Sequence, residues 1–456
     1  MPYKNQQAGK GGHSDIVKNP DVADFLKNCQ YIREPSDDEG KAVAGTFTPA
    51  PAGVLPLPEK LAASDASIYN EPISGKFPST QVGYVKVSIV LIDLGQFSAL
   101  SAPGSRYVDP FKVAAMHRNA DGYAFSLPGS NIRYGGEKSV REGFRKRVSE
   151  QFCDPRYAFD SSVGYRLIDT LLVLSKLNGT ALKKCPVCAE EFAAPIDFTA
   201  AATTTPCPKC GTTLYATDVL HMHEEISDFG SNATVITRFM NVIEHVMMAT
   251  LIRMLADKLP ETLSKIGFVI DGPLALFGRP AWLHRPLMAM YQDIAAMLAA
   301  QGLEPPVIMG LQKDGVVMDH ARSVQRFLAP NSYRPVDDNY REQWISGKPS
   351  EAKTHGSETY YGQDFIFKTE RGGVFCVGLP YPMRDKGNEA VFSVQKTEVH
   401  RYGDRIGRAF DVVREFEFDL YENSIIPVAL AHRHASISLV PGGKVLDLVT
   451  RVGLGG

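Results

Sequence analysis

Short apolar segments that alternate with long helical segments constrain the fold of this chain most. Residues 84–93 begin with alternating polar and apolar residues and become continuously apolar, as expected for a strand entering a buried sheet. Similar strand-like segments follow later in the chain, at residues 265–272, 307–313, 373–379 and 412–420. Helical periodicity covers residues 137–152, 162–177, 234–259 and 287–301. This order predicts an α/β fold with a mixed sheet flanked by helices.

The domain organisation follows from changes in composition along the chain. Residues 41–60 are rich in Ala, Pro, Gly and Thr, so we expect residues 1–80 to form a partly flexible N-terminal arm. Ordered structure is expected to begin after it, with residues 81–184 and 214–456 forming two parts of one core. Residues 185–213, which contain four of the cysteines, are expected to be a small insertion.

Overall composition bounds the function. The formal net charge is −2, so any nucleic-acid surface must be a local one. The N-terminus lacks the apolar core of a signal peptide, and no apolar stretch reaches the ~20 residues needed to span a bilayer. Four of the seven cysteines lie in two close pairs, which is typical of a metal site in a reducing compartment. We therefore expect a cytoplasmic protein that does not interact with membranes.

Cys185, Cys188, Cys207 and Cys210 form two Cys-x-x-Cys pairs with eighteen residues between them. Four thiolates at this spacing predict a tetrahedral zinc ribbon. Because four sulfur ligands leave no open position for water, the zinc is expected to be structural, and the ribbon could also contact DNA or a partner protein. Two histidines, His221 and His223, follow the ribbon closely, and we expect both at the surface because the cysteines already satisfy the metal.

Several acidic residues lie at the ends of apolar segments. Asp93 ends the segment 84–93, Asp271 ends the segment 265–272, and Glu244 lies within the apolar helix 234–259. Burying a carboxylate is unfavourable unless something compensates its charge, and a divalent cation with oxygen ligands does so. The pattern predicts a metal-dependent active site assembled from distant segments.

Each of these residues also has a structural alternative. An aspartate after a strand commonly caps a turn or a helix, which applies to both Asp93 and Asp271. Glu244 could lie on an exposed helical stripe. Two further candidates are His432, which could be a hydrogen-bonded core histidine, and Lys313, which could be a solvated charge at a strand end.

Five motifs together resemble the NurA family of nucleases. Ile-Asp-Leu-Gly around Asp93 is similar to the first family motif, and Glu244 stands where the family has its second acidic ligand. Ile-Asp-Gly-Pro-Leu around Asp271 resembles the third motif, and Gly-Leu-Gln-Lys ending at Lys313 resembles the strand that follows it. Pro-Val-Ala-Leu-Ala-His ending at His432 resembles the closing motif, and all five occur in family order.

The resemblance implies an RNase H-like core that binds Mn²⁺ or Mg²⁺ through Asp93, Glu244 and Asp271 and cleaves DNA phosphodiesters. Lys313 would contact phosphate, and His432 would move a proton or position the phosphate. Family members typically form homodimers and dock onto a hexameric HerA-type ATPase, in DNA-end processing or antiviral defence. The family tyrosine eight residues before the closing histidine is replaced by Ser424.

A charged helix offers candidate DNA contacts at Arg141, Arg145, Lys146 and Arg147. A solvated helix face would explain these residues equally well. The alternative function is a non-catalytic zinc-ribbon adaptor that binds nucleic acid or assembles a complex on a degenerate NurA fold. The nuclease hypothesis requires the acidic residues to lie close together with space for a cation between them, whereas the adaptor hypothesis does not.

Overall fold

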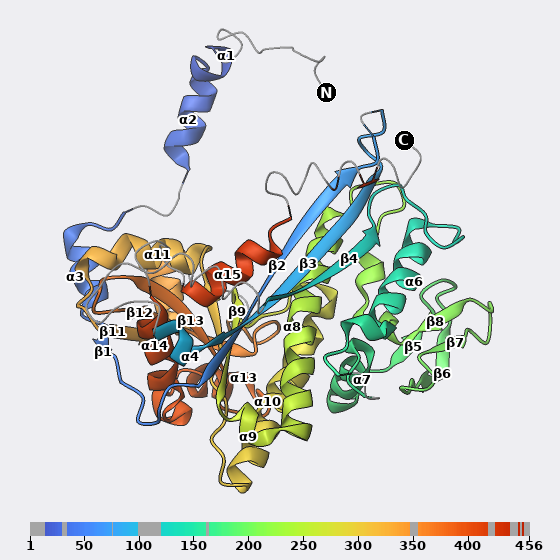
Figure 1. Ribbon diagram of the computed structural model, residues 1–456. Helices are drawn as coiled ribbons and strands as arrows, with labels where there is room; N and C mark the ends of the chain where they lie inside the picture. Colours follow the sequence, from blue (N-terminus) through green and yellow to red (C-terminus); the bar gives the residue numbers. More distant parts are fainter. Residues whose placement is uncertain are drawn as a thin grey trace.

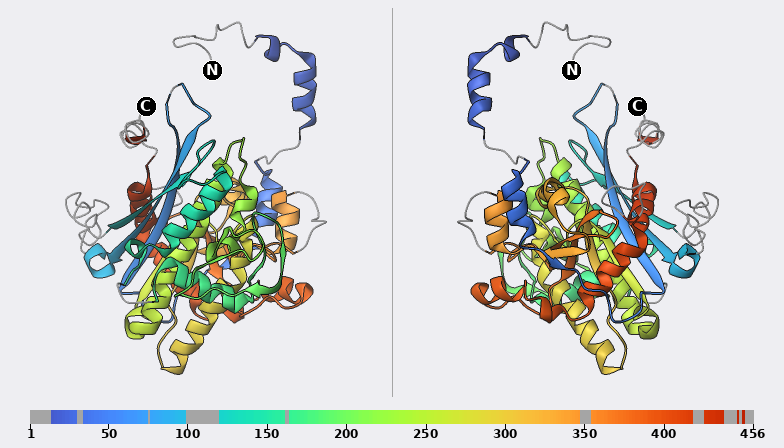
Figure 2. Two further views of the ribbon diagram at one scale, coloured as in Figure 1. Left: turned by 90° about the vertical axis from the view of Figure 1, so that its right-hand side faces the viewer. Right: turned by 90° about the vertical axis from the view of Figure 1, so that its left-hand side faces the viewer.

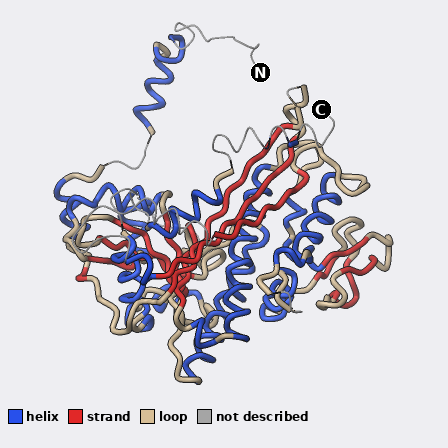
Figure 3. The backbone as a smooth tube through the Cα atoms, in the orientation of Figure 1, coloured by secondary structure: helices blue, strands red, loops and turns tan. Residues whose placement is uncertain are grey.

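A nine-stranded mixed sheet forms the centre of the protein (Figures 1 and 3), with strand order β1-β11-β12-β13-β10-β9-β2-β3-β4. The computed structural model describes residues 14–29, 34–74, 76–98, 120–160, 164–346, 354–417, 425–437, 446 and 449–450. The strands of the sheet are β1 (Thr48–Pro49), β2 (Lys60–Pro72), β3 (Gln81–Asp93), β4 (Ala120–Pro128), β9 (Ile266–Asp271), β10 (Ile308–Gln312), β11 (Ser332–Pro335), β12 (Gly362–Lys368) and β13 (Val374–Pro380).

The three central strands are parallel, and this arrangement creates an opening in the sheet. β9 lies between β2 and β10 and is parallel to both, whereas the other pairings are antiparallel. β9 pairs with β2 only as far as Ser64, while β2 continues to Pro72 along β3. The carboxyl ends of β9 and β10 therefore meet the middle of β2, where parallel sheets commonly place their ligands.

Helices cover both faces of the sheet. They are α3 (Asp37–Ala44), α4 (Leu94–Ser98), α6 (Val140–Cys153), α7 (Leu167–Asn178), α8 (Ala233–Lys258), α9 (Pro260–Leu263), α10 (His284–Ala300), α11 (Val316–Val324), α12 (Asp338–Tyr340), α13 (Glu389–Gln395), α14 (Arg405–Phe416) and α15 (Ile426–Ala435). Figure 2 shows α15 on one side of the β2–β3 hairpin and the green helices on the other. The predicted mixed α/β fold is confirmed.

Alternating side chains assign each helix layer to one face of β2 and β9. Ala62 and Ile270 are buried in a core cluster with residues of α6, α7, α8 and α10. Ala63 and Val269 are buried in a second cluster with residues of α14 and α15. Because successive side chains of a strand point to opposite faces of the sheet, a polar residue near this opening faces α8 if it is in phase with Ala62 or Ile270, and α15 if it is in phase with Ala63 or Val269.

Helix α8 is long and apolar enough to cross a membrane by length and composition. In the fold, 72% of its most apolar 18-residue stretch is buried, and the sheet and α7 pack against the helix. Its hydrophobicity is thus explained by its place in the core.

Two expectations about the chain were wrong. Residues 34–74 do not belong to an arm: β2 is a central strand of the sheet, and its pairing with β3 and β9 overrides the weak strand propensity of its alanines and serines. Within the described part of residues 1–80, only α1 (Ser14–Val17) and α2 (Pro20–Asn28) extend from the body as an arm would (Figure 1), and α2 has no buried residue. The strand expected at 412–420 is wrong for the part that the structure describes: residues 412–416 form the end of α14, where Ile406, Phe410 and Val413 recur at helical spacing. Residues 418–420 lie outside the described residues.

The cysteine-rich insertion forms two small two-stranded sheets between α7 and α8. These are β5 (Leu182–Lys184) with β6 (Glu191–Ile196), and β7 (Thr204–Pro206) with β8 (Thr213–Tyr215). Two 3₁₀ helices, η4 (Ala216–Leu220) and η5 (Met222–Glu225), lead from the insertion to α8.

Candidate active site

Two aspartates meet where β9 ends beside β2. Asp65 follows Ala63 by two residues on β2, and Asp271 follows Val269 by two residues on β9, so both side chains face the α15 side. Ser64 is the last β2 residue paired with β9, through Ile270. Donor atoms of Asp65, Asp271 and His432 all lie within 4.8 Å of one another. Asp65 is 5% exposed, so the pair is largely shielded from water.

A lysine and a histidine complete this side of the site. Lys313 follows β10, and its Nζ donates to Oδ2 of Asp271 at 2.6 Å. His432 lies on α15, and its Nδ1 is 2.8 Å from Oδ2 of Asp65. The imidazole is 56% exposed, so its second nitrogen is accessible from solvent. The structure thus brings together Lys313, Asp271 and His432 from three separate parts of the chain.

Glu244 approaches the same opening from the other side of the sheet. It lies on α8, is 5% exposed, and accepts a hydrogen bond of 2.9 Å from the Ser64 hydroxyl through Oε1. Because Ser64 alternates with Asp65, this hydroxyl faces α8 while the neighbouring carboxylate faces α15. Glu244 is nevertheless close enough for the charges of both Asp65 and Asp271 to raise its pKa.

Burial raises the pKa of all three carboxyl groups, and repulsion from neighbouring acids adds to this for Asp271 and Glu244. Burial is the largest cause for Asp271, whose pKa is raised to about 7 against the opposing effect of the Lys313 ammonium. Burial likewise raises the pKa of Asp65. The pKa of Glu244 is raised well above its ordinary value by burial, and then by repulsion from Asp65 and Asp271. Carboxyl groups with raised pKa values tend to keep their protons. A divalent cation bound among them would displace these protons and stabilise the carboxylates.

The donor set fits a hard divalent cation. Asp65 and Asp271 offer carboxylate oxygens at one point, and Glu244 offers another from the α8 side of the sheet; such oxygens suit Mg²⁺ and Mn²⁺. The Asp65 and Asp271 carboxyl groups lie close together, and the charge of Asp65 helps to raise the pKa of Asp271, so a proton or a cation between them would relieve their repulsion.

The structure does not place Asp93 in this cluster. Asp93 pairs with Lys60 at one end of β3, whereas Asp65 pairs with Ser88. Five residues of strand separate Ser88 from Asp93, which is roughly 17 Å. Its carboxylate accepts a hydrogen bond of 3.0 Å from the backbone N–H of Gln96 at the start of α4. The expectation that Asp93 is a metal ligand was wrong, and the alternative of a capping aspartate describes it.

Asp65 is the residue that sequence reasoning missed. It follows Leu61-Ala-Ala-Ser, a short apolar and small run that ends in a carboxylate just as the segments before Asp93 and Asp271 do. Prolines at positions 51, 56 and 58 and the small side chains made this segment look like part of an arm. The repeated pattern of a small or apolar run before an aspartate was the signal that could have identified it.

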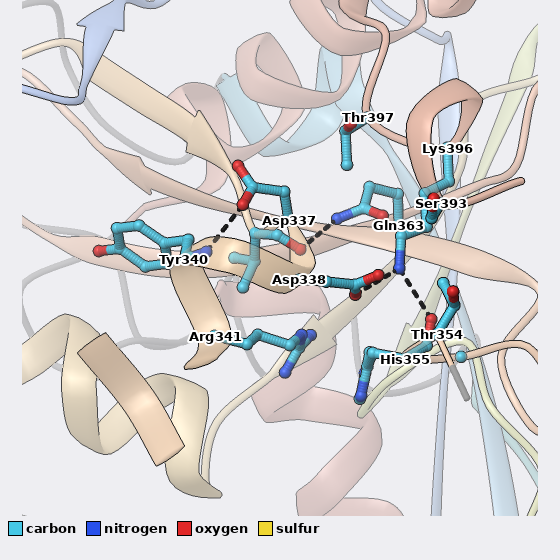
Figure 4. A network of polar contacts seen from close by, with 12 residues as sticks. Asp337, Asp338, Tyr340, Arg341, Thr354, His355, Gln363, Ser393, Lys396 and Thr397 are labelled. Atoms are coloured by element: carbon cyan, nitrogen blue, oxygen red, sulfur yellow. Dashed lines mark hydrogen bonds and ion pairs between the residues drawn. The ribbon is translucent and has the colours of Figure 1, made fainter. Parts of the chain in front are cut away.

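The chain that follows Asp271 is held in place by a buried polar network. The backbone of Leu274 and Leu276 hydrogen-bonds to that of Tyr361 and Thr359, respectively. The segment 354–361 is in turn anchored by Lys396, which is 1% exposed and donates to Asp338 at 2.7 Å and to the His355 carbonyl at 2.9 Å (Figure 4).

A second ammonium, which is partly buried, supports the same segment. Lys386 donates to the carbonyl oxygens of Gly356, Ser357 and Tyr360 at 2.6, 3.0 and 2.6 Å. Burial lowers the pKa of Lys386 to about 6. Three carbonyl acceptors favour the ammonium form, because a neutral amine has only two hydrogens to donate. The two lysines thus fix a segment that supports the loop after Asp271.

The four expected DNA contacts on α6 have partners within the protein. Arg145 is 3% exposed and forms a buried pair with Asp218 at 2.7 Å, so it cannot contact DNA in this fold. Arg141 donates to the Ile226 carbonyl. Lys146 and Arg147 keep partial exposure, with ion pairs to acidic residues at 3.6 and 3.3 Å. The helix face is explained by packing and local ion pairs.

The four cysteines of the insertion converge as their spacing predicts. The sulfur atoms of Cys185, Cys188, Cys207 and Cys210 lie within 4.8 Å of one another. The Cys185–Cys210 and Cys188–Cys207 distances are both 3.9 Å. This arrangement fits one tetrahedral metal ion with four thiolate ligands.

Comparison with known proteins gives limited similarity. No protein-family model matches this chain, and no curated protein matches it. The crystal structure of the NurA nuclease from Sulfolobus solfataricus is 9% identical over 96% of this chain and 93% of that chain, with a TM-score of 0.35. A crystal structure of NurA with manganese is 10% identical over 96% of this chain and 98% of that chain, with a TM-score of 0.24. Both TM-scores lie below 0.5, so the account of the site depends on the residues of this chain alone.

Proposed function

We propose that this chain is a metal-dependent nuclease that hydrolyses phosphodiester bonds in DNA. The observation that carries the proposal is that Asp65 and Asp271 meet between β2 and β9, and that both raise the pKa of Glu244 on the other face of the sheet. These residues come from three distant segments, and burying them together is unfavourable without a compensating cation. A set of structural caps would not need to meet in one place.

Asp65, Glu244 and Asp271 would hold Mn²⁺ or Mg²⁺. When bound, the cation would neutralise the scissile phosphate and lower the pKa of an attacking water. Lys313, which already contacts Asp271, lies within reach of the same space and would stabilise charge on a phosphate oxygen.

His432 is suited to moving a proton. Its Nδ1 faces the Asp65 carboxylate, so the ring is held with Nδ1 protonated and Nε2 available as an acceptor. Burial and then the Lys313 charge lower the pKa of His432, which keeps the ring neutral near pH 7. A neutral imidazole open to solvent can accept a proton from water at the edge of the site.

DNA as the substrate and the biological setting follow from the five-motif resemblance to NurA nucleases. We propose an RNase H-like NurA-type core, a homodimer, and a cytoplasmic role in DNA-end processing or defence against foreign DNA. The sequence contains no Gly-x-x-x-x-Gly-Lys-Ser/Thr motif, so ATP-driven movement of DNA would need a partner such as a hexameric HerA-type ATPase. The four-cysteine cluster would hold structural zinc.

The second candidate is a non-catalytic adaptor on a degenerate NurA fold. The position of Asp93 favours it slightly, because the first motif of the resemblance does not contribute to the site. Under this hypothesis the four-cysteine ribbon would bind nucleic acid or a partner, and the acidic cluster would serve only to shape the core.

The test is manganese-dependent cleavage of linear and circular DNA by the wild type, Asp65→Asn and the matched control Asp93→Asn. Each protein is assayed alone and with any HerA-type ATPase that co-purifies. We expect the wild type and Asp93→Asn to cleave, and Asp65→Asn to lose at least about a hundredfold in rate while it keeps its zinc. Equal cleavage by all three would indicate a contaminant. No cleavage by any of them, alone or with the ATPase, would favour the adaptor.

A further inference from the structure

A second group of metal-binding side chains lies in the connection between the cysteine insertion and α8. The donor atoms of His221, His223 and Glu224 all lie within 4.8 Å of one another. The sequence suggested that both histidines are surface residues, but His223 is only 6% exposed. These three residues belong neither to the four-cysteine cluster nor to the acidic site, and the proposed nuclease activity does not use them.

The backbone at this point is shaped so that the two imidazoles approach each other. His221 has a φ of 54° and joins η4 to η5 in the left-handed region, which is uncommon for a residue other than glycine. Such a conformation persists where the surroundings or a function compensate it. The ring centroids of His221 and His223 are 6.1 Å apart and their planes differ by 32°.

Burial favours a neutral His223 ring, and the neighbouring hydrogen bond and cations favour an ionised Glu224 carboxylate. Burial lowers the pKa of His223 to about 4, and the neutral imidazole is the form that binds metals. Its Nδ1 lies 3.9 Å from the carboxylate of Asp218, whose charge opposes the effect of burial on the His223 pKa. His221 Nδ1 is 2.9 Å from Oε1 of Glu224, and contact with His221 helps to lower the pKa of Glu224.

We propose that His221, His223 and Glu224 form a second zinc site, with water as the fourth ligand. Two imidazoles and one carboxylate are a common protein ligand set for zinc. Ligands of a tetrahedral zinc ion lie about 3.3 Å apart, so small side-chain rotations would close the observed cluster around the ion. A bound zinc ion would stabilise the left-handed backbone conformation at His221. It would also stabilise the connection between the cysteine insertion and α8, the helix that carries Glu244.

One cation competes for the site. Nε of Arg279 lies 3.1 Å from Oε2 of Glu224, and the Arg279 side chain is 62% exposed. Zinc would have to share Glu224 with this guanidinium or displace it. The backbone N–H of Arg279 is held by Glu225 at 3.1 Å, so the side chain can swing away without moving the loop. Removing the guanidinium should therefore strengthen zinc binding.

The experiment uses the full chain carrying Asp271→Asn, with zinc in the cysteine cluster and excess Mg²⁺ present, to weaken transition-metal binding at the acidic site. Titration with Co²⁺ is followed by absorbance, because cobalt bound by nitrogen and oxygen shows d–d bands without the charge-transfer bands of thiolate ligands. We expect the d–d bands to saturate with the parent. His221→Asn and Glu224→Gln should each weaken binding at least about tenfold. Arg279→Gln should bind more tightly, and the control His400→Asn should match the parent.

Zinc content measured after dialysis gives an independent readout. The parent is expected to retain one more zinc ion per chain than either His221→Asn or Glu224→Gln, with a cooperative thermal transition retained in both variants as the control for folding. Equal zinc content and equal cobalt spectra in the parent and both variants would overturn the proposal.

Discussion

Asp271→Asn should make the protein more stable at high pH in the absence of Mn²⁺ and Mg²⁺. Burial raises the pKa of Asp271 from 3.8 to about 7, so between these values the folded protein binds a proton that the unfolded chain has released. The free energy of unfolding therefore falls as pH rises through this window. Because asparagine cannot ionise, Asp271→Asn should not show this decrease in the free energy of unfolding.

The magnitude follows from the size of the pKa change. Between pH 5 and pH 8, one group with these two pKa values lowers the free energy of unfolding by about 3 kcal/mol. For a chain of 456 residues, the entropy of unfolding is roughly 1 kcal/mol per kelvin, so the expected change in Tm is about 3 °C.

The assay is thermal melting at pH 5 and pH 8 after dialysis against metal-free buffer, which leaves tightly held zinc in place. The Tm of Asp271→Asn minus that of the wild type should increase by about 3 °C between the two pH values. For the matched control Asp93→Asn, the difference in Tm from the wild type should be the same at pH 5 and at pH 8. Added Mn²⁺ should stabilise the wild type more at pH 8, because protons compete with the metal. A difference between Asp271→Asn and wild type that does not change with pH would refute the reasoning.

Three further predictions concern the support of the fold. Arg145→Ala leaves Asp218 buried without its partner and should lower stability by about 3–5 kcal/mol, whereas Lys146→Ala should change it by less than about 1 kcal/mol; thermal melting of both separates a structural role from a DNA contact. Cys188→Ser should lose one zinc per chain and expose the insertion to limited proteolysis, and retention of zinc would contradict a four-thiolate site. Lys396→Met should destabilise the protein by about 2–3 kcal/mol and slow DNA cleavage through loosening of the loop after the site, and normal melting would contradict the anchoring role.

Much of the fold could be predicted from periodicity. The helix 234–259 and the strand ending at Asp271 were predicted because each is long or apolar enough for its burial to show in sequence. β2 could not be predicted in the same way, because Leu61-Ala-Ala-Ser has little strand propensity of its own. Its structure depends on pairing with β3 and β9, and β9 lies about two hundred residues away in sequence.

The same cause explains the errors at the site. Asp93 and Asp271 look equivalent in sequence because each ends an apolar run, but β3 is antiparallel to β2 and carries its end away from the site. Strand direction and register decide which of two similar aspartates reaches a cluster. Arg145 shows a related limit, because its burial depends on Asp218, and no local pattern marks the two as partners.

The most direct test of the account is Mn²⁺ binding to the wild type, Asp65→Asn and Asp93→Asn, followed by electron paramagnetic resonance at pH 8. If Asp65, Glu244 and Asp271 hold a divalent cation, Asp65→Asn should bind Mn²⁺ at least about tenfold more weakly than the wild type, and Asp93→Asn should bind as the wild type does. Equal binding by the wild type and Asp65→Asn, or a loss confined to Asp93→Asn, would contradict the account.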